Sequence, residues 1–390
     1  MHTTRYLIVG GGLTADAACK GIREVDPDGR ITVIADEAHP PYARPPLSKA
    51  LWKGTEESSI WRGTENLGVE LRLGRRIATI DPATHRATDD RGEVYAYERL
   101  LLATGGRPRR LPFGGDEVVY YRTLDDYRRL RALAAADKRF VVIGGGFIGS
   151  EIAAALAMNG RPVTMVFPEP GIGARIFPPD LSAFVTDYYR ARGVEVLTGS
   201  SVTALERDAD TVHVTTGDGR VLEADAVVAG LGLAPSTELA ETAGLHVSNG
   251  IVVDDRGHVE GGEDVFAAGD VARFPAAALG GTMRVEHEDH AKSHGRRVGA
   301  NMAGADEPYD HLPFFYSDLF ELGYEAVGEL DSRLRTTADW THVGGAGTVY
   351  YLDDDGRPRG VLLWNLFGRV DTARNLIRAA APMQTAELVG

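Results

Sequence analysis

The sequence predicts an α/β protein, and two features support this prediction. The apolar run 6–9 leads into three glycines and then a small-residue segment, the pattern of a buried parallel strand, a tight turn and a helix. The same pattern returns at 140–151, after a series of shorter alternating runs. The chain is therefore expected to contain two copies of one strand–turn–helix unit.

The first turn has the pattern of a dinucleotide-binding fingerprint. Gly10 permits a tight turn, Gly12 lets the backbone approach a pyrophosphate, and Ala15 lets the helix lie close to the strand. The helix N-terminus then offers unpaired N–H groups to an anion. The next strand, 30–35, ends at Asp36, an acid suited to ribose hydroxyls. An ordinary strand–turn–helix without a ligand is the alternative.

Composition limits the possible partners and compartments. A length of 390 residues suggests two or three domains, and a net charge of −14 argues against nucleic acid or an anionic membrane as partner. No apolar run is long enough to span a bilayer, and a first strand near residue 5 leaves no room for a signal peptide. The only cysteine is Cys19, so neither a disulfide within the chain nor a redox CxxC pair can form. We expect a cytoplasmic protein.

The chain between the two glycine turns predicts a loop and several strands. The proline-rich segment 39–49 is expected to be a rigid loop that opens into a helix near Leu47 and presents Arg44 and Lys49. A surface turn with solvated charges is the alternative. Strands are expected at 69–73, 76–80, 93–97 and 100–103, and the last runs into Thr104 and Gly105, where backbone could approach a cofactor. A polar-faced helix follows at 123–136.

The second turn carries all three fingerprint glycines, Gly144, Gly146 and Gly149. Its repetition is more specific than either copy, and it implies two dinucleotides between which electrons pass. Beyond it we expect a strand at 162–167, a helix around 179–191, a strand at 194–197, a hairpin around 212–221 and strands at 226–229 and 264–268. A helix is expected at 285–302, followed by an α+β segment.

Together these motifs resemble a known family. They are the Pro-Tyr-x-Arg-Pro-Pro-Leu-Ser-Lys loop at 41–49, Ala-Thr-Gly-Gly at 103–106 and Ala-Gly-Asp at 268–270. The chain resembles the two-dinucleotide-binding flavoproteins that include ferredoxin reductases of oxygenase systems and apoptosis-inducing factor. Segments 167–169, 284–291 and 323–326 look like the apoptosis-inducing-factor branch. The resemblance implies two Rossmann-like domains plus a C-terminal α+β domain: FAD-binding, 1–115 and 245–310; NAD-binding, 116–244; C-terminal, 311–390.

The resemblance also implies which residues hold FAD. Lys49 would lie near flavin N5, where a cation stabilises added electron density, and Asp36 replaces the glutamate usual in the branch. Trp364 is either ordinary core or a residue near the flavin. The implied FAD contacts are Gly10, Gly11, Gly12, Leu13, Thr14, Ala15, Asp36, Glu37, Arg44, Lys49, Ala78, Thr104, Gly105, Arg109, Asp270, Glu286, His287, Glu288 and Trp364.

The second unit, by the same resemblance, binds the nicotinamide nucleotide. Glu151 would orient the nicotinamide amide over the flavin; the alternative is an acid that only complements the helix dipole. Glu169 would bind the ribose and favour NADH over NADPH, which Arg175 counteracts. The implied contacts are Gly144, Gly146, Phe147, Ile148, Gly149, Glu151, Glu169, Arg175 and Gly232, with Glu286 beside both cofactors.

The resulting prediction is an NADH-dependent FAD oxidoreductase, with Lys49 and Glu151 as catalytic residues. Its expected acceptor is a small iron–sulfur protein that docks at a local basic patch such as Arg107–Arg110, and it is expected to be a monomer or homodimer. His287, His290 and His294 share a helical face, but we expect no metal there. The alternative function is a redox-sensing interaction protein, similar to apoptosis-inducing factor, that changes its assembly on binding NADH.

Overall fold

The structure of the protein is a computed structural model that describes residues 1–383. The chain divides into two compact units: one of Met1–Ala43, Ser58–Arg107 and Ala234–Pro313, the other of Arg44–Glu57, Pro108–Leu233 and Phe314–Gly390. The sequence-based boundaries placed 44–57, 108–115, 234–244 and 311–313 differently, and the three-domain division stays a prediction. Residues 384–390 of the predicted C-terminal domain lie outside the described residues.

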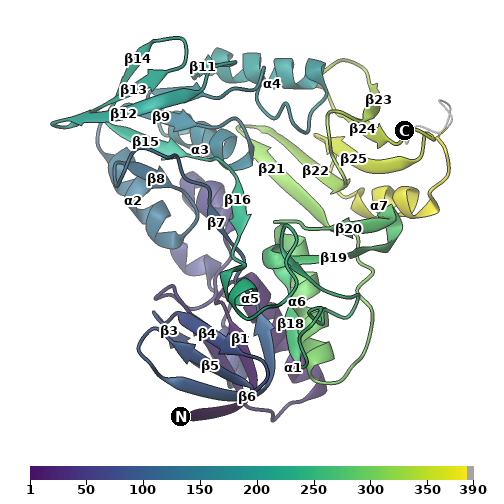
Figure 1. Cartoon of the computed structure of the whole chain (residues 1–390). Coiled ribbons are helices and arrows are strands. Elements are labelled where there is room, and N and C mark those ends of the chain that lie inside the picture. The colour runs from purple at the N-terminus through teal and green to yellow at the C-terminus, as the bar shows by residue number, and fades with distance from the viewer. Residues whose placement is uncertain (384–390) are drawn as a thin grey trace. The chain divides into compact units, whose positions relative to one another are not determined.

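The first unit is built on a seven-stranded sheet in the order β3-β2-β1-β6-β5-β4, with β18 also paired to β6 (Figure 1). β1, β2, β3, β6 and β18 run parallel, whereas β4 and β5 form an antiparallel edge. The apolar runs of β1 and β6 pair in register, which explains their nearly continuous hydrophobicity. The strands are β1 (His2–Val9), β2 (Ile31–Ala35), β3 (Glu70–Leu73), β4 (Ile77–Asp81), β5 (Arg86–Asp89), β6 (Val94–Leu102) and β18 (Val265–Ala267).

Two helices of the first unit, α1 (Leu13–Val25) and α6 (Glu288–Met302), lie side by side (Figure 1). Glycines allow the close approach: a Cβ on Gly299 would lie 2.2 Å from the Ala18 carbonyl oxygen. The expected helix start at 285 is wrong by three residues, because 284–287 are not helical and His287 is the N-cap. The smaller elements are α5 (Glu238–Thr242), a sheet of β17 (Ile251–Val252), β19 (Ala272–Ala276) and β20 (Gly281–Met283), and 3₁₀ turns at Glu57–Ile60, Thr64–Leu67, Gly269–Val271 and Ala277–Leu279.

The second unit contains a parallel five-stranded sheet in the order β11-β10-β9-β15-β8. These strands are β8 (Val118–Tyr120), β9 (Phe140–Ile143), β10 (Val163–Val166), β11 (Glu195–Leu197) and β15 (Ala226–Ala229). The expected hairpin is an antiparallel sheet of β12 (Val202–Asp208), β13 (Thr211–Thr216) and β14 (Val221–Ala224). The helices are α2 (Leu124–Ala135), α3 (Phe147–Met158) and α4 (Pro179–Ala191), and the helix expected near Leu47 is a pair of 3₁₀ turns, Pro45–Ser48 and Ala50–Lys53. Short strands β7 (Gly106–Pro108) and β16 (Leu233–Pro235) pair with each other.

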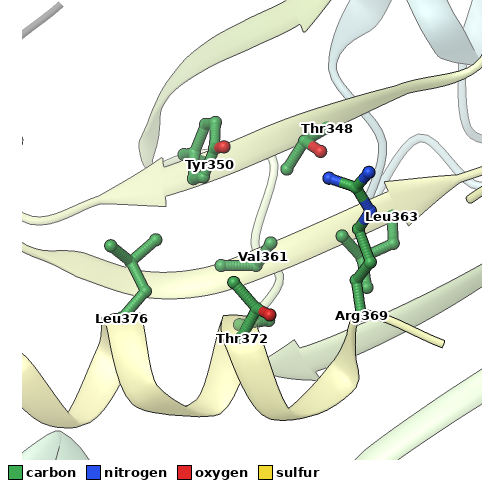
Figure 2. A pocket seen from close by; sticks show the side chains of 8 residues that line it. Thr348, Tyr350, Val361, Leu363, Arg369, Thr372 and Leu376 are labelled. Atoms are coloured by element: carbon green, nitrogen blue, oxygen red, sulfur yellow. The ribbon is translucent and has the colours of Figure 1, made fainter. Parts of the chain in front are cut away.

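The C-terminal part of the second unit is an antiparallel sheet in the order β21-β22-β25-β24-β23, covered on one face by α7 (Val370–Ala379). Figure 2 shows Thr348, Tyr350, Val361 and Leu363, which line a pocket together with residues of α7. The strands are β21 (Phe314–Leu319), β22 (Leu322–Gly328), β23 (Arg335–Trp340), β24 (Gly347–Leu352) and β25 (Pro358–Trp364). The predicted fold class is confirmed: two parallel-sheet Rossmann-like parts and an antiparallel C-terminal sheet. Within residues 1–383, no helix is long and apolar enough to span a bilayer.

Candidate dinucleotide sites and the buried Lys49–Glu151 pair

The two glycine turns have the same backbone geometry. Gly10 and Gly144 both have φ of +115°, a conformation that residues with a side chain rarely adopt. A Cβ on Gly10 would lie 2.2 Å from the Ala103 carbonyl oxygen, and one on Gly144 would lie 2.4 Å from the Gly230 carbonyl oxygen. In both turns the strand therefore ends so close to a neighbouring segment that only glycine fits.

The second glycine of each turn has a different reason to be glycine. Gly12 and Gly146 have φ of −91° and −84°, which any residue adopts, and no heavy atom lies within 4 Å of a Cβ built on either. The fold itself does not require glycine there. A side chain at either position would instead fill the open space before the helix N-terminus, where a pyrophosphate approaches backbone N–H groups. Both turns thus fit a dinucleotide.

Several other predicted FAD residues lie around the first turn in the first unit. Thr14 and Gly269 are in contact, because a Cβ on Gly269 (φ +75°) would lie 2.1 Å from Thr14 Oγ1. Thr104 donates to the Ser236 carbonyl at 2.8 Å, which ties the end of β6 to the segment before α5. Asp270 follows Gly269 in a short 3₁₀ turn at the end of β18. The structure therefore gathers the ends of β1, β6 and β18 around the first turn.

The remaining predicted residues of the first unit occupy strand ends, turns and the start of α6. Asp36 is exposed directly after β2, and Glu37 accepts a hydrogen bond of 2.5 Å from the Tyr42 hydroxyl. Ala78 is exposed at a register shift of β4. Gly11 lies against Ala35, Leu13 starts α1, Ala15 is fully buried, Gly105 has positive φ, His287 caps α6, and Glu288 pairs with Lys292.

Arg284 is a candidate site residue that the sequence did not single out beyond its motif. Its guanidinium donates to the Asp270 carbonyl at 3.0 Å and to the Glu286 carboxylate at 2.7 Å. Its Nε is buried and makes no hydrogen bond to the described residues. Arg284 therefore holds the Asp270 turn, and its buried Nε is a donor that could bind a ligand.

Glu151 is the centre of the site in the second unit. It lies near the start of α3 and is only 4% exposed, and its carboxylate accepts hydrogen bonds from three donors. Lys49 Nζ lies 2.7 Å from Oε1, Ser317 Oγ lies 2.6 Å from the same oxygen, and Ser48 Oγ lies 2.5 Å from Oε2. A charged pair so far removed from water needs such hydroxyl donors to offset its desolvation. The sequence named Lys49 and Glu151 but neither serine.

The Pro45–Lys53 segment presents Lys49 because it is anchored on both sides of that residue. Two consecutive prolines start the first 3₁₀ turn, and the Leu47 carbonyl accepts hydrogen bonds from Trp52 Nε1, at 2.8 Å, and from the Tyr121 hydroxyl. Arg44 donates to the Arg122 carbonyl at 3.1 Å. The Lys49 side chain is only 11% exposed, so a turn with solvated charges is wrong for Lys49.

The other predicted nucleotide residues lie on the loops of the parallel sheet. Glu169, after β10, is paired with Arg175 at 2.5 Å, so the two groups with opposite expected effects on the ribose neutralise each other. The Gly232 carbonyl accepts from the Arg109 backbone N–H at 2.9 Å. Phe147 and Ile148, at the start of α3, are each 37% exposed, and a Cβ on Gly149 would lie 2.0 Å from the Gly144 carbonyl oxygen.

Trp364 is fully buried in the C-terminal sheet, where its ring stacks on Tyr324 at 5.8 Å and its Nε1 donates to the Gly344 carbonyl at 3.1 Å. The structure gives this ring a packing role, and its contact with a cofactor stays a prediction. Cys19 is also fully buried, and burial, followed by the nearby Asp16, raises the pKa of its thiol to about 12. This thiol is therefore unreactive at neutral pH.

His290 and His294 form an aromatic cluster with Phe274 and Tyr309. His290 Nδ1 lies 3.0 Å from the Tyr309 hydroxyl, and His294 Nδ1 accepts from the Gly269 N–H at 3.3 Å. Burial lowers the pKa of His294 to about 3 and that of His290 well below its usual value. Among residues 1–383, no group of three or more His, Cys, Asp or Glu side chains is arranged to hold a metal.

Two glycine turns that can each accept a dinucleotide, together with a buried lysine–glutamate pair, are the features of an oxidoreductase that binds two dinucleotides. The family model for pyridine nucleotide-disulphide oxidoreductases matches residues 4–295, and that for the C-terminal region of mitochondrion-associated apoptosis-inducing factor matches residues 298–346. The chain therefore belongs to the pyridine nucleotide-disulphide oxidoreductase family. It is an FAD-dependent NAD(P)H oxidoreductase, with FAD and NAD as its cofactors.

Three matches, two of them to putidaredoxin reductase, cover most of the chain. Apoptosis-inducing factor 1 of Dictyostelium discoideum is 34% identical over 96% of this chain and 78% of its own length. Putidaredoxin reductase of Pseudomonas putida is 34% identical over 90% of this chain and 86% of its own length. Among solved structures, the covalent putidaredoxin reductase–putidaredoxin complex matches with a TM-score of 0.91 and 32% identity, covering 98% of this chain and 95% of the matched chain.

Proposed function

We propose that this chain is a ferredoxin reductase, which passes electrons from NADH through FAD to a small iron–sulfur protein. FAD accepts a hydride and can release electrons singly, which matches a one-electron acceptor. The similarity to putidaredoxin reductase along nearly the whole chain supports this acceptor class. The chain has a single cysteine, so it has no dithiol of its own to relay electrons.

The observation that carries the proposal is the buried Lys49–Glu151 pair just beyond the Gly146 turn. Gly146 leaves space for a pyrophosphate, and Glu151 lies one helical turn further along α3. We assign its carboxylate to the nicotinamide carboxamide, whose N–H it would accept. We assign the Lys49 ammonium to the flavin, where a nearby cation favours the reduced form.

We further propose that NADH is preferred over NADPH. Glu169 is positioned after β10, where a carboxylate accepts from ribose hydroxyls and repels a 2′-phosphate. Its ion pair with Arg175 holds that cation away from a phosphate. Ferredoxin-type acceptors are commonly acidic, and this chain has a net charge of −14, so docking needs a local basic surface. Arg110, whose guanidinium lies over the Tyr120 ring, is a candidate for that surface.

The test is steady-state electron transfer from NADH to a [2Fe–2S] ferredoxin, to dioxygen and to a two-electron quinone acceptor. We expect the ferredoxin to be reduced with the highest kcat/KM. Arg110→Glu should raise the KM for ferredoxin and leave FAD reduction by NADH unchanged. The proposal fails if ferredoxin is reduced no faster than dioxygen while the flavin is reduced normally by NADH.

A redox-sensing role is the second candidate function, favoured by the match to the apoptosis-inducing-factor C-terminal model at residues 298–346. In that case NADH would change the assembly state, and turnover would be incidental. Light scattering of the FAD-loaded protein with and without NADH distinguishes the two. An unchanged mass together with fast ferredoxin reduction excludes the sensing role.

We also propose a cytoplasmic location. The single cysteine, Cys19, is buried and unpaired, as expected for a protein of a reducing compartment.

A further inference from the structure

Ser317 stands out because it is a polar residue at an almost completely buried position of the C-terminal sheet. It lies in β21 and is 1% exposed. A buried serine usually satisfies its hydroxyl on a nearby backbone carbonyl. Ser317 instead donates to the carboxylate of Glu151, a residue 166 positions away in the sequence, at 2.6 Å.

The C-terminal sheet holds the Ser317 hydroxyl in place through one cross-strand row. Ser317 is paired with Tyr324 of β22, and Tyr324 is paired with Trp364 of β25. The Tyr324 ring is stacked on Trp364 at an interplanar angle of 12°. All three side chains are almost completely buried. The row therefore ends in a hydroxyl with a fixed position and direction.

The three donors around Glu151 leave one acceptor position open. A carboxylate offers about four lone-pair positions, two on each oxygen. Lys49 and Ser317 occupy both positions of Oε1, whereas Oε2 accepts, among residues 1–383, only from Ser48. The free position therefore lies on Oε2. If Ser317 were absent, Oε1 would be held by the flexible Lys49 alone, and the orientation of the carboxylate would depend on Lys49 and Ser48 without a donor from the C-terminal sheet.

We propose that Ser317 is a positioning residue for the nicotinamide: it fixes the Glu151 carboxylate so that Oε2 keeps one acceptor position for the carboxamide N–H. The inference rests on the proposed function, since it assumes that NADH reduces FAD beside Glu151. It adds a task for the C-terminal sheet, which would set the geometry of hydride transfer through the Ser317 hydroxyl and Glu151. Ser317 acts through Glu151 and is not itself catalytic.

The test is single-turnover reduction of the FAD-loaded protein by two reductants. One is NADH, and the other is reduced 3-acetylpyridine adenine dinucleotide, whose acetyl group keeps the carbonyl but has no N–H to donate. Removing one hydrogen bond that orients a charged acceptor should lower the efficiency of reduction by NADH about tenfold in Ser317→Ala. The analogue should reduce wild type and Ser317→Ala at similar rates, because it cannot use the position that Ser317 maintains.

Matched variants separate positioning from general packing. Thr348→Val removes a buried hydroxyl from the same sheet, on the face toward α7, and should leave both rates unchanged (Figure 2). Ser317→Thr, which keeps the hydroxyl, should restore reduction by NADH. If Ser317→Ala does not fold or does not retain FAD, Ser317→Cys keeps the volume, replaces the hydroxyl with a weak donor and should show the same loss with NADH.

Two results would overturn the inference. The first is an unchanged rate with NADH in Ser317→Ala or Ser317→Cys. The second is an equal loss with NADH and with the analogue, which would mean that Ser317 does not act through the carboxamide. Failure of the proposed function looks different, because it would appear in the wild-type protein as ferredoxin reduced no faster than dioxygen, although NADH reduces the FAD normally.

Discussion

Lys49 and Glu151 should contribute to stability as a coupled pair, and a double-mutant cycle measures that coupling. Lys49→Met leaves a buried carboxylate with only two hydroxyl donors. Removing one partner of a buried ion pair typically destabilises a protein by about 3–5 kcal/mol. Because both serine contacts are retained in Lys49→Met, we expect its free energy of unfolding to fall by about 3 kcal/mol, the lower end of this range. Glu151→Gln should be milder, at about 2 kcal/mol, because Lys49 is 11% exposed and can reach water.

The double variant Lys49→Met/Glu151→Gln contains no unpaired buried charge. It should therefore be less destabilised than the sum of the single variants, with a coupling of about 2–3 kcal/mol. Thermal unfolding in saturating FAD, followed by tryptophan fluorescence, is the assay. With an unfolding entropy of about 2.1 cal/mol/K per residue, a loss of about 3 kcal/mol corresponds to a decrease in Tm of about 4 °C for the 390-residue chain. Lys53→Met is the matched control, because Lys53 and Asp318 form an exposed pair at 3.8 Å and should contribute at most about 1 kcal/mol. Strictly additive single effects would refute a buried, coupled pair.

Three other outcomes are expected. Gly12→Ala should fold with a near wild-type Tm but lose FAD, whereas Gly10→Ala should disturb the fold itself; retained yellow colour in Gly12→Ala would show that its open side faces no ligand. Glu169→Ala should raise kcat/KM for NADPH relative to NADH at least about tenfold by releasing Arg175, and an unchanged ratio would place the ribose elsewhere. His294 has a folded-state pKa of about 3, below the unfolded value, so its stabilising effect is fully present above about pH 6.5 and declines by about 2 kcal/mol on going to pH 5. His294→Asn, which keeps an acceptor for the neighbouring N–H, should flatten the dependence of Tm on pH, and an equally steep dependence would assign the loss to other groups.

The sequence by itself determined the parts of this protein that depend on local chemistry. The glycine turns follow from short-range rules, because a strand end with φ of +115° accepts only glycine and a ligand-facing backbone accepts no side chain. The apolar runs of β1 and β9 predicted buried parallel strands, because a strand covered on both faces carries apolar side chains on both. The resemblance to a family then added Lys49 and Glu151 as individual residues.

Only the tertiary structure decided how those residues act together. Lys49 and Glu151 are 102 positions apart, and Ser317 is 166 positions from Glu151, so no local pattern records their contacts. The serine in β21 looks like any small residue of a strand until the sheet registers of Ser317, Tyr324 and Trp364 align one row of side chains. Burial then decides the chemistry, because a carboxylate removed from water holds its partners far more strongly than the same group on a surface.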